Sequence, residues 1–452
     1  MYENNLDQLK NQMGSKITHV INKNSPLLPF VSREPERVKF NHGFDGIIGE
    51  FSRIYSEKSW NDEFEINNLV NNILSGNDNI SCSKEDEEAL KIFIKEYLIN
   101  EKQELNILHP HLFLYLPLSD NLEKTGEKRI GEFFNDVFFK DITEFKDFFE
   151  NKESNQVIIK FILENIPDLP SKDKELKYIS VLPFVTDVFR EDIVFAKEHE
   201  SFLINNFEYI LAFYYFYYVS QFSIKLNQSY EAVSLEEPTE TYYLLDWEKA
   251  SGSRRSVNKG YNLIKEANKN LLVRINIIEQ LNILLGTHGL FPFQILNIIN
   301  EASNQEKDEF LSVLEQWIDY YNEKKMIISS TVAHDYKPLV KSLFNSLDQG
   351  IQQAPKSRYG KNLEELAKKY LAKSRGQYGL MLNLNKDFLY IITALCVKEN
   401  KIKLNDLFDE YERRGLFFDR YSKEEIVTLL NKWNLIDKKS DSGDAQYVKS
   451  IL

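Results

Sequence analysis

The sequence KDFLYIITALCVKENKIKLNDLFDEYERRGLFF, residues 386–418, begins the part of the chain whose fold follows most directly from its side chains. Apolar residues recur over 388–397 at the spacing of one helix face, which predicts a helix. The alternating segment 401–404 predicts a short strand. Apolar spacing over 407–411 predicts a second helix, which Gly415 ends.

A third helix and a β-hairpin complete this unit. Ser422 and Glu425 have the spacing of a capping box, so we expect the third helix to begin there and to bury apolar residues as far as Trp433. Two β segments, 435–439 and 445–449, flank an Asp-Ser-Gly-Asp turn. This order of helices and strands predicts a winged helix, a module that binds nucleic acid or another protein.

The charges of this unit favour a protein partner over nucleic acid. A wing that lies on DNA normally presents lysine or arginine to the phosphates, whereas this tip carries Asp441 and Asp444. The third helix exposes a nearly neutral set of side chains without the arginine that most often contacts guanine. These side chains are Lys423, Glu424, Thr428, Asn431 and Lys432. Protein docking is therefore the expected role, and nucleic-acid contact stays open.

Length and charge set limits on the class of protein. A chain of 452 residues has room for about two to four domains. Its net charge of −13 does not attract nucleic acid or anionic lipid, so such binding would depend on local patches. Cys82 and Cys396 are far apart and predict no disulfide framework. The N-terminus also lacks the pattern of an export signal. Together with the missing disulfide framework, this absence predicts a cytoplasmic protein.

One aromatic run imitates a membrane span. The run YILAFYYFYYV occupies residues 209–219, within an apolar segment over 202–224. It is shorter than the roughly 20 apolar residues that a bilayer requires, and polar side chains flank it. We therefore expect a helix buried among other helices, and no membrane contact.

The rest of the sequence predicts a mainly α protein. Further helical spacing occurs at 64–74, 88–99, 130–149, 154–166, 263–285 and 310–328. Composition shifts suggest four regions: a helical N-terminal domain over 1–235, a helical central domain with a basic loop over 241–352, a basic connecting segment over 353–385, and the winged-helix domain over 386–452.

Two basic segments interrupt the acidic background. The first follows Trp247 in a glycine- and serine-rich loop, and the second leads into the predicted winged helix. The candidate nucleic-acid contacts on them are Arg254, Arg255, Lys259, Lys356, Arg358, Lys361, Lys373 and Arg375. For the second segment the alternative is a solvated surface, because Glu364 and Glu365 precede Lys368 and Lys369 at the spacing of helix ion pairs.

Motifs of known chemistry are missing from the sequence. It contains no P-loop and no nucleophile elbow, and the glycine-rich segment 43–49 predicts a loop-to-helix turn. The two histidines of 109–111 have no acidic cluster beside them to complete a metal site. Glu191, Asp192 and Lys197 imitate a nuclease set, but this spacing is common by chance. We therefore expect a protein that is not an enzyme and has no cofactor or metal.

Three segments resemble one known family. TYYLLDWEKAS at 241–251, followed by Arg254, is similar to a segment typical of the DptG family, also called DndG. RRGLFFD at 413–419 and KSDSGDAQYV at 439–448 resemble the same family, and the chain length and domain order agree with it. The family belongs to a bacterial restriction system that attacks DNA lacking phosphorothioate modification. The resemblance implies an antiviral defence role, DptF-like ATPase and DptH-like helicase subunits as partners, and no catalytic motif.

Two functional hypotheses follow. The first is a non-catalytic assembly or DNA-docking subunit of such a restriction complex, in which partner chains hydrolyse ATP and damage DNA. The second is a DNA-contacting subunit that uses the basic segments for backbone binding independent of sequence.

Overall fold

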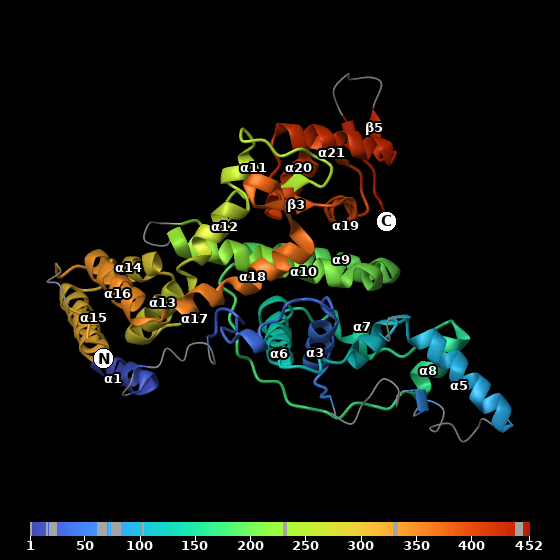
Figure 1. Ribbon diagram of the computed structural model, residues 1–452, viewed down its shortest axis with the longest axis horizontal. Coiled ribbons are helices and arrows are strands. Elements are labelled where there is room, and N and C mark those ends of the chain that lie inside the picture. The colour runs from blue at the N-terminus through green and yellow to red at the C-terminus, as the bar shows by residue number, and fades with distance from the viewer. Residues whose placement is uncertain are drawn as a thin grey trace. The chain divides into compact units, whose positions relative to one another are not determined.

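The computed structural model describes residues 2–14, 17, 25–60, 70–71, 73, 83–101, 104–228, 233–328, 333–438 and 446–452. The described part is mainly helical, as predicted (Figure 1). Cys82, most of the predicted helix at 64–74, and the wing-tip residues Asp441 and Asp444 lie outside it.

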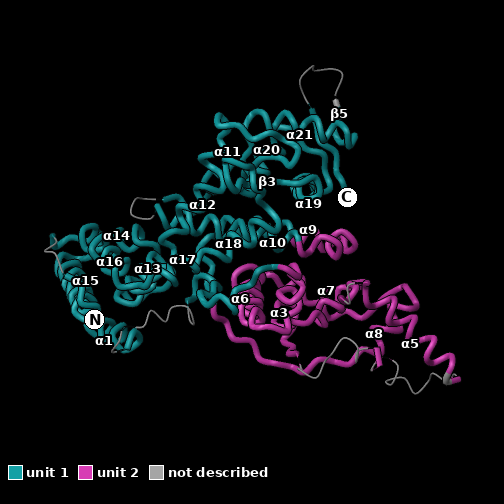
Figure 2. Tube along the Cα trace, in the orientation of Figure 1, with its two compact units in different colours: residues 1–40, 178–192, 209–452 teal, residues 41–177, 193–208 magenta. Residues whose placement is uncertain are grey.

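The chain divides into two compact units (Figure 2). Unit 1 contains residues 1–40, 178–192 and 209–452, and unit 2 contains residues 41–177 and 193–208. The predicted boundary near residue 235 therefore falls inside unit 1.

Unit 2 is helical with an aromatic core. Its elements are α3 (Asp45–Tyr55), α5 (Lys84–Leu98), the 3-10 helix η2 (Pro110–Tyr115), α6 (Lys124–Phe133), the π-helix η3 (Phe134–Phe138), α7 (Lys146–Glu150) and α8 (Val157–Asn165). The ring of Phe51 on α3 lies 4.3 Å from that of Phe139 and 5.9 Å from that of Phe149, centroid to centroid. The predicted loop-to-helix turn at 43–49 is confirmed, because α3 begins within it. The predicted helix at 130–149 is wrong, because η3 and a loop divide it.

Unit 1 holds most of the helices. Those before residue 380 are α1 (Tyr2–Met13), η1 (Glu34–Glu36), α11 (Arg255–Asn258), α12 (Tyr261–Asn268), α13 (Leu271–Leu285), α14 (Pro292–Glu301), α15 (Asn304–Lys325), α16 (Tyr336–Gly350), α17 (Gln353–Tyr359), α18 (Lys361–Leu366), the π-helix η4 (Ala367–Leu371) and η5 (Gly376–Tyr378). Two longer helices, α9 (Pro183–Glu198) and α10 (Glu200–Gln228), contribute residues to both units.

The aromatic run forms the middle of α10, and residues 210–226 are all buried. Tyrosine hydroxyls of this run hydrogen-bond to neighbouring segments: Tyr217 donates to the carbonyl of Arg413 over 2.8 Å, and Tyr218 accepts from the amide of Val181 over 2.9 Å. The prediction of a buried helix is confirmed. Among the described helices, none has a stretch that is both long and apolar enough for a membrane span.

The segment predicted as one helix over 263–285 forms two. α12 ends at Asn268, and Asn270 adopts non-helical angles (φ −115°, ψ 16°) before α13 begins. The reason is packing: α13 is buried on nearly every side, so its surroundings fix its direction independently of α12. Gly286 ends α13 with φ +80°, as the sequence predicted.

The described residues of unit 1 form two small sheets. In the first, β3 (Leu380–Leu384) pairs in parallel with β1 (Leu244–Leu245) and antiparallel with β2 (Ala372–Ser374). In the second, β6 (Gln446–Val448) lies between β4 (Ile402–Lys403) and β5 (Ile436–Lys438), antiparallel to both.

The C-terminal region has the predicted order of elements. α19 (Lys386–Val397), β4, α20 (Leu404–Arg413), α21 (Arg420–Lys432), β5 and β6 follow one another. The start of α21 was predicted wrongly: the carboxylate of Asp419 caps the helix by accepting from the amide of Ser422 over 3.1 Å. Ser422 is therefore buried inside the helix, and Trp433 is only half-buried at its end. The winged-helix assignment itself stays a prediction.

Candidate docking surface on the C-terminal helices

Arg254, a predicted phosphate contact, is buried against α21. Its guanidinium donates to both carboxylate oxygens of Asp419 over 2.5 and 2.8 Å, and to Glu248 over 2.8 Å. It also donates to the hydroxyl of Ser422 over 2.7 Å. Burial would lower the pKa of Arg254, but hydrogen bonds to Asp419 and Glu248 outweigh it and raise that pKa. A phosphate could reach this arginine only by displacing two carboxylates.

Glu248 and Ser422 complete the connection between the basic loop and α21. The hydroxyl of Ser422 donates to one carboxylate oxygen of Glu248 over 2.8 Å, and the same oxygen accepts from the amide of Leu245 over 2.7 Å. Farther along α21, the indole of Trp247 donates to Glu425 over 2.9 Å. The loop over 247–254 is thus fixed to the N-terminal half of α21 by charged hydrogen bonds.

We call the junction of this loop with α21 the fixed corner. An open groove of about 850 Å³ lies along it. Its lining comes from the loop, from the segment before α21 and from the first turns of α21: Ser253, Arg255, Phe418, Asp419, Arg420, Tyr421, Lys423, Glu424, Val427 and Thr428. Tyr421 is 61% exposed, which is unusual for a large aromatic side chain. Sequence reasoning selected Arg255, Lys423, Glu424 and Thr428 but missed Tyr421, because a single exposed aromatic residue leaves no pattern.

Each cation of the groove has a partner within the chain. Arg420 pairs with Glu424 over 2.9 Å, and Lys423 pairs with Glu412 over 2.9 Å. Arg255 is exposed and donates to the hydroxyl of Tyr242 over 2.6 Å. The groove therefore combines apolar surface with nearly balanced charge, as protein interfaces do.

Three further residues predicted to contact nucleic acid lie at the same corner or near it, and each has a partner within the protein. Arg375 donates to the side chain of Asn383 over 2.6 Å and to the backbone carbonyl of Glu248 over 3.0 Å, which holds the turn after β1 against β3. Lys373 pairs with Asp246 over 3.2 Å, and Lys259 pairs with Glu240 over 2.8 Å. Lys373 and Lys259 remain exposed.

The two predicted basic segments meet at a second place. A hollow of about 590 Å³ lies between α12 and the junction of α17 and α18, and lysines from both segments line it: Lys265, Lys269, Lys356 and Lys361. Lys356 pairs with Asp348 over 2.8 Å, and Lys269 pairs with Glu266 over 2.6 Å. Within the described residues, Lys265, Lys361 and the nearby exposed Arg358 pair with no carboxylate. Their convergence was not predicted.

The remaining candidates have structural partners. His111 is buried with Nδ1 2.7 Å from the carbonyl of Phe149, and burial lowers the pKa of His111 to about 4. Asp192 lies in a buried ion pair with Arg414, and Lys197 contacts the carbonyl of Glu144. No group of three metal-ligating side chains occurs in the described ranges.

Comparison with models of known protein families found no match, and comparison with curated proteins found none either.

Proposed function

We propose that this chain is a non-catalytic assembly subunit and that the groove on α21 docks a partner protein. The observation that carries the proposal is the fixed corner formed by Arg254, Asp419 and Glu248. It holds one wall of the groove in place before a partner arrives, and such preorganisation lowers the entropic cost of binding. The exposed ring of Tyr421 provides the kind of aromatic anchor that contributes most to protein interfaces.

The resemblance to the DptG family gives the proposal a specific form. The partners would be DptF-like ATPase and DptH-like helicase subunits of an antiviral restriction complex acting on DNA without phosphorothioate. Two of the segments that carry the resemblance meet beside the groove: the amide of Tyr243 donates to the carbonyl of Phe417 over 2.9 Å, and Arg254 binds Asp419. The contact between these two segments supports the proposal that the residues shared with the family form one surface.

Co-expression tests this function. The full-length chain would be produced together with the ATPase-like and helicase-like subunits from the same genome, and a tag on this chain would be used for purification. The proposal predicts stable recovery of at least one partner, through salt washes that remove contacts held by surface charge alone. Recovery of this chain alone, with both partners expressed and soluble, would contradict it.

A second candidate function is direct contact with the DNA backbone, favoured by the lysine hollow. Lys265 and Lys361 approach it from different segments, and Arg358 lies on the adjoining helix. Three unpaired cations near one hollow would fit phosphates on a duplex, and each phosphate neutralised would add roughly 0.9 to the salt dependence of binding.

The test of this second function is fluorescence polarisation with a labelled duplex over a range of salt concentrations. Replacing Lys265, Arg358 and Lys361 together by Gln should reduce the slope of log binding constant against log salt concentration by the amount that about two to three phosphate contacts contribute. Lys369→Gln, at an exposed lysine outside the hollow, is the matched control. An equal slope in the triple variant and the wild type would exclude DNA contact at this place.

A further inference from the structure

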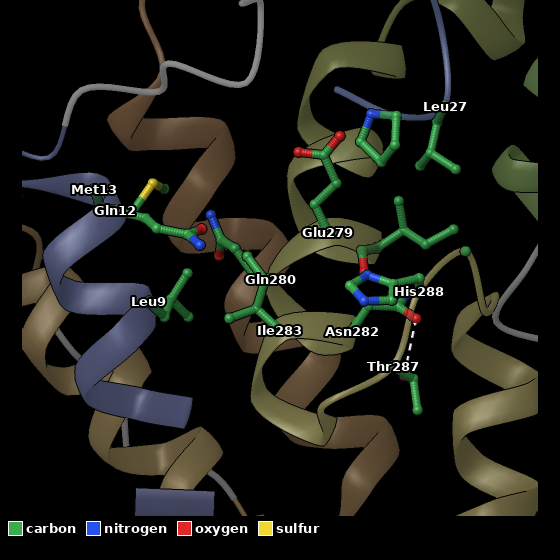
Figure 3. Close-up of a pocket in the computed structure, with 13 residues that line it drawn as sticks. Leu9, Gln12, Met13, Leu27, Glu279, Gln280, Asn282, Ile283, Thr287 and His288 are labelled. Atoms are coloured by element: carbon green, nitrogen blue, oxygen red, sulfur yellow. Dashed lines mark hydrogen bonds between the residues drawn. The ribbon is translucent and has the colours of Figure 1, made fainter. Parts of the chain in front are cut away.

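A separate cavity of about 490 Å³ lies in unit 1 between α1 and α13 (Figure 3). Leu9 and Met13 line it from α1, Ile283 lines it from α13, and Leu27 lies at its edge. Its size and its mostly apolar walls match those of small-molecule sites in proteins.

Two polar groups in this cavity have unused hydrogen-bonding capacity. Glu279 projects from α13, and its Oε1 is buried without a partner among the described residues. Its carboxylate has a hydrogen bond from the side chain of Ser25. Gln280 is 1% exposed; its Oε1 accepts from the indole of Trp317 over 3.0 Å, while its Nε2 is buried and has no partner in the part of the chain that the structure describes. Buried polar atoms are rarely left unsatisfied in folded proteins, so two such atoms beside one apolar cavity favour a ligand there.

Glu279 defines the charge of that missing group. In the described residues it has no ion pair, and no lysine or arginine side chain lines the cavity. Burial raises the pKa of Glu279 to about 8, and the hydrogen bond from Ser25 acts in the opposite direction. An ammonium group in the cavity would provide the counter-charge that this carboxylate lacks.

We propose that this cavity binds a small organic amine, with its ammonium group on Glu279 and its apolar body between Leu9, Met13 and Ile283. A hydrogen-bond acceptor on the same ligand would satisfy the amide of Gln280. The site lies apart from α21, and this inference does not depend on the proposed docking function.

Hexylamine and 1-hexanol are a matched pair of probes, because they share an apolar chain and differ in the charge of one end. Binding to the full-length protein would be measured by calorimetry at pH 8.5, where hexylamine is protonated and Glu279 is mostly ionised. We expect wild-type protein to bind hexylamine about tenfold more tightly than 1-hexanol, as a charged hydrogen bond in a desolvated site implies.

Two variants separate charge from shape. Glu279→Gln keeps the size of the side chain, and it should reduce the preference for hexylamine to less than about threefold. Ile283→Phe should fill the cavity and weaken the binding of both probes, with the charge unchanged. The proposal is overturned if wild-type protein binds 1-hexanol as tightly as hexylamine, if Glu279→Gln keeps the preference, or if neither probe binds.

Discussion

Arg414 and Asp192 form a completely buried ion pair with two parallel hydrogen bonds. Arg414 Nε donates to Asp192 Oδ2 over 2.8 Å and Nη2 donates to Oδ1 over 2.6 Å, and both side chains are 0% exposed. Burial would lower the pKa of Arg414, but the charge of Asp192 outweighs it and raises that pKa well above its ordinary range. The pair ties the end of α20 to α9 within unit 1. Its neighbours Arg413 and Glu191 form a second pair at the surface.

These adjacent pairs predict very different effects of mutation. Among the described carboxylates, Asp192→Asn leaves the buried charge of Arg414 with the partly exposed Glu410 alone, and it should lower the free energy of unfolding by about 3 kcal/mol or more. Glu191→Gln, the matched control, should cost less than about 1 kcal/mol because solvent screens its pair. Urea unfolding followed by tryptophan fluorescence measures both. Equal losses of unfolding free energy in the two variants would contradict the difference in burial between the two ion pairs.

Gly415 and Gly376 should differ in how well they tolerate replacement by alanine. Its φ is +74°, and an added Cβ would lie 2.2 Å from the ring of Tyr217 on α10. Gly415→Ala should therefore destabilise the protein by about 3 kcal/mol or more, through strain and overpacking together. Gly376 also has positive φ (+57°), but an added Cβ would meet nothing within 4 Å. Gly376→Ala should cost only about 1 kcal/mol in thermal or urea unfolding. Similar effects at both positions would show that α10 does not pack closely on this turn.

Asp419 has two roles, and comparison with Asn385, a helix cap that forms no ion pair, separates them. It caps α21 and also binds Arg254, so Asp419→Ala should cost about 3 kcal/mol or more. Asn385 caps α19 by accepting from the amide of Phe388 over 2.8 Å, and it has no such ion pair. Asn385→Ala should cost about 1 kcal/mol, the usual effect of a lost cap. Hydrogen exchange should also become faster over 246–254 in the Asp419 variant alone. Unchanged exchange in that loop would argue against the Arg254 connection.

Glu279 predicts a pH dependence of stability. Burial raises its pKa in the folded protein to about 8, above its ordinary 4.5, so the folded state keeps a proton that the unfolded state releases. Its contribution to stability is therefore present below pH 4.5 and is lost as pH rises to 8, by at most about 1.4 kcal/mol per pH unit. Asp45, whose pKa burial raises to about 7, acts in the same direction. Glu279→Gln should lose less stability than the wild type between pH 5 and about 8. Parallel pH profiles would contradict this.

Local spacing in the sequence was sufficient for much of the fold. The buried helix α10, the end of α13 at Gly286 and the order of the C-terminal elements all follow from patterns a few residues long. The start of α21 was missed because Ser422 and Glu425 match a capping box, while Asp419 offers an equally good cap three residues earlier. The long-range contact with Arg254 favours Asp419 as the cap, and contacts with Arg254 and Glu248 bury Ser422.

The candidate site was harder to predict, because its residues come from distant segments. Arg254 looks like a surface cation in a glycine-rich loop, and nothing nearby in the sequence indicates that Asp419 binds it. Lys265 and Lys361 likewise belong to segments that were treated as separate surfaces. The positions of single basic residues were known from the sequence, but their partners depend on tertiary structure.

The most direct test of the proposed docking role compares two exposed tyrosines of the C-terminal region. Tyr421 lies in the groove, with its ring centroid 5.3 Å from the guanidinium carbon of Arg254, and Tyr390 lies outside it, with its ring centroid 5.6 Å from that of Trp433. The affinity of full-length protein for a co-purified partner subunit would be measured for Tyr421→Ala and Tyr390→Ala. We predict about tenfold or greater weakening for Tyr421→Ala and wild-type affinity for Tyr390→Ala. Wild-type affinity of a folded Tyr421→Ala protein would contradict docking through this groove.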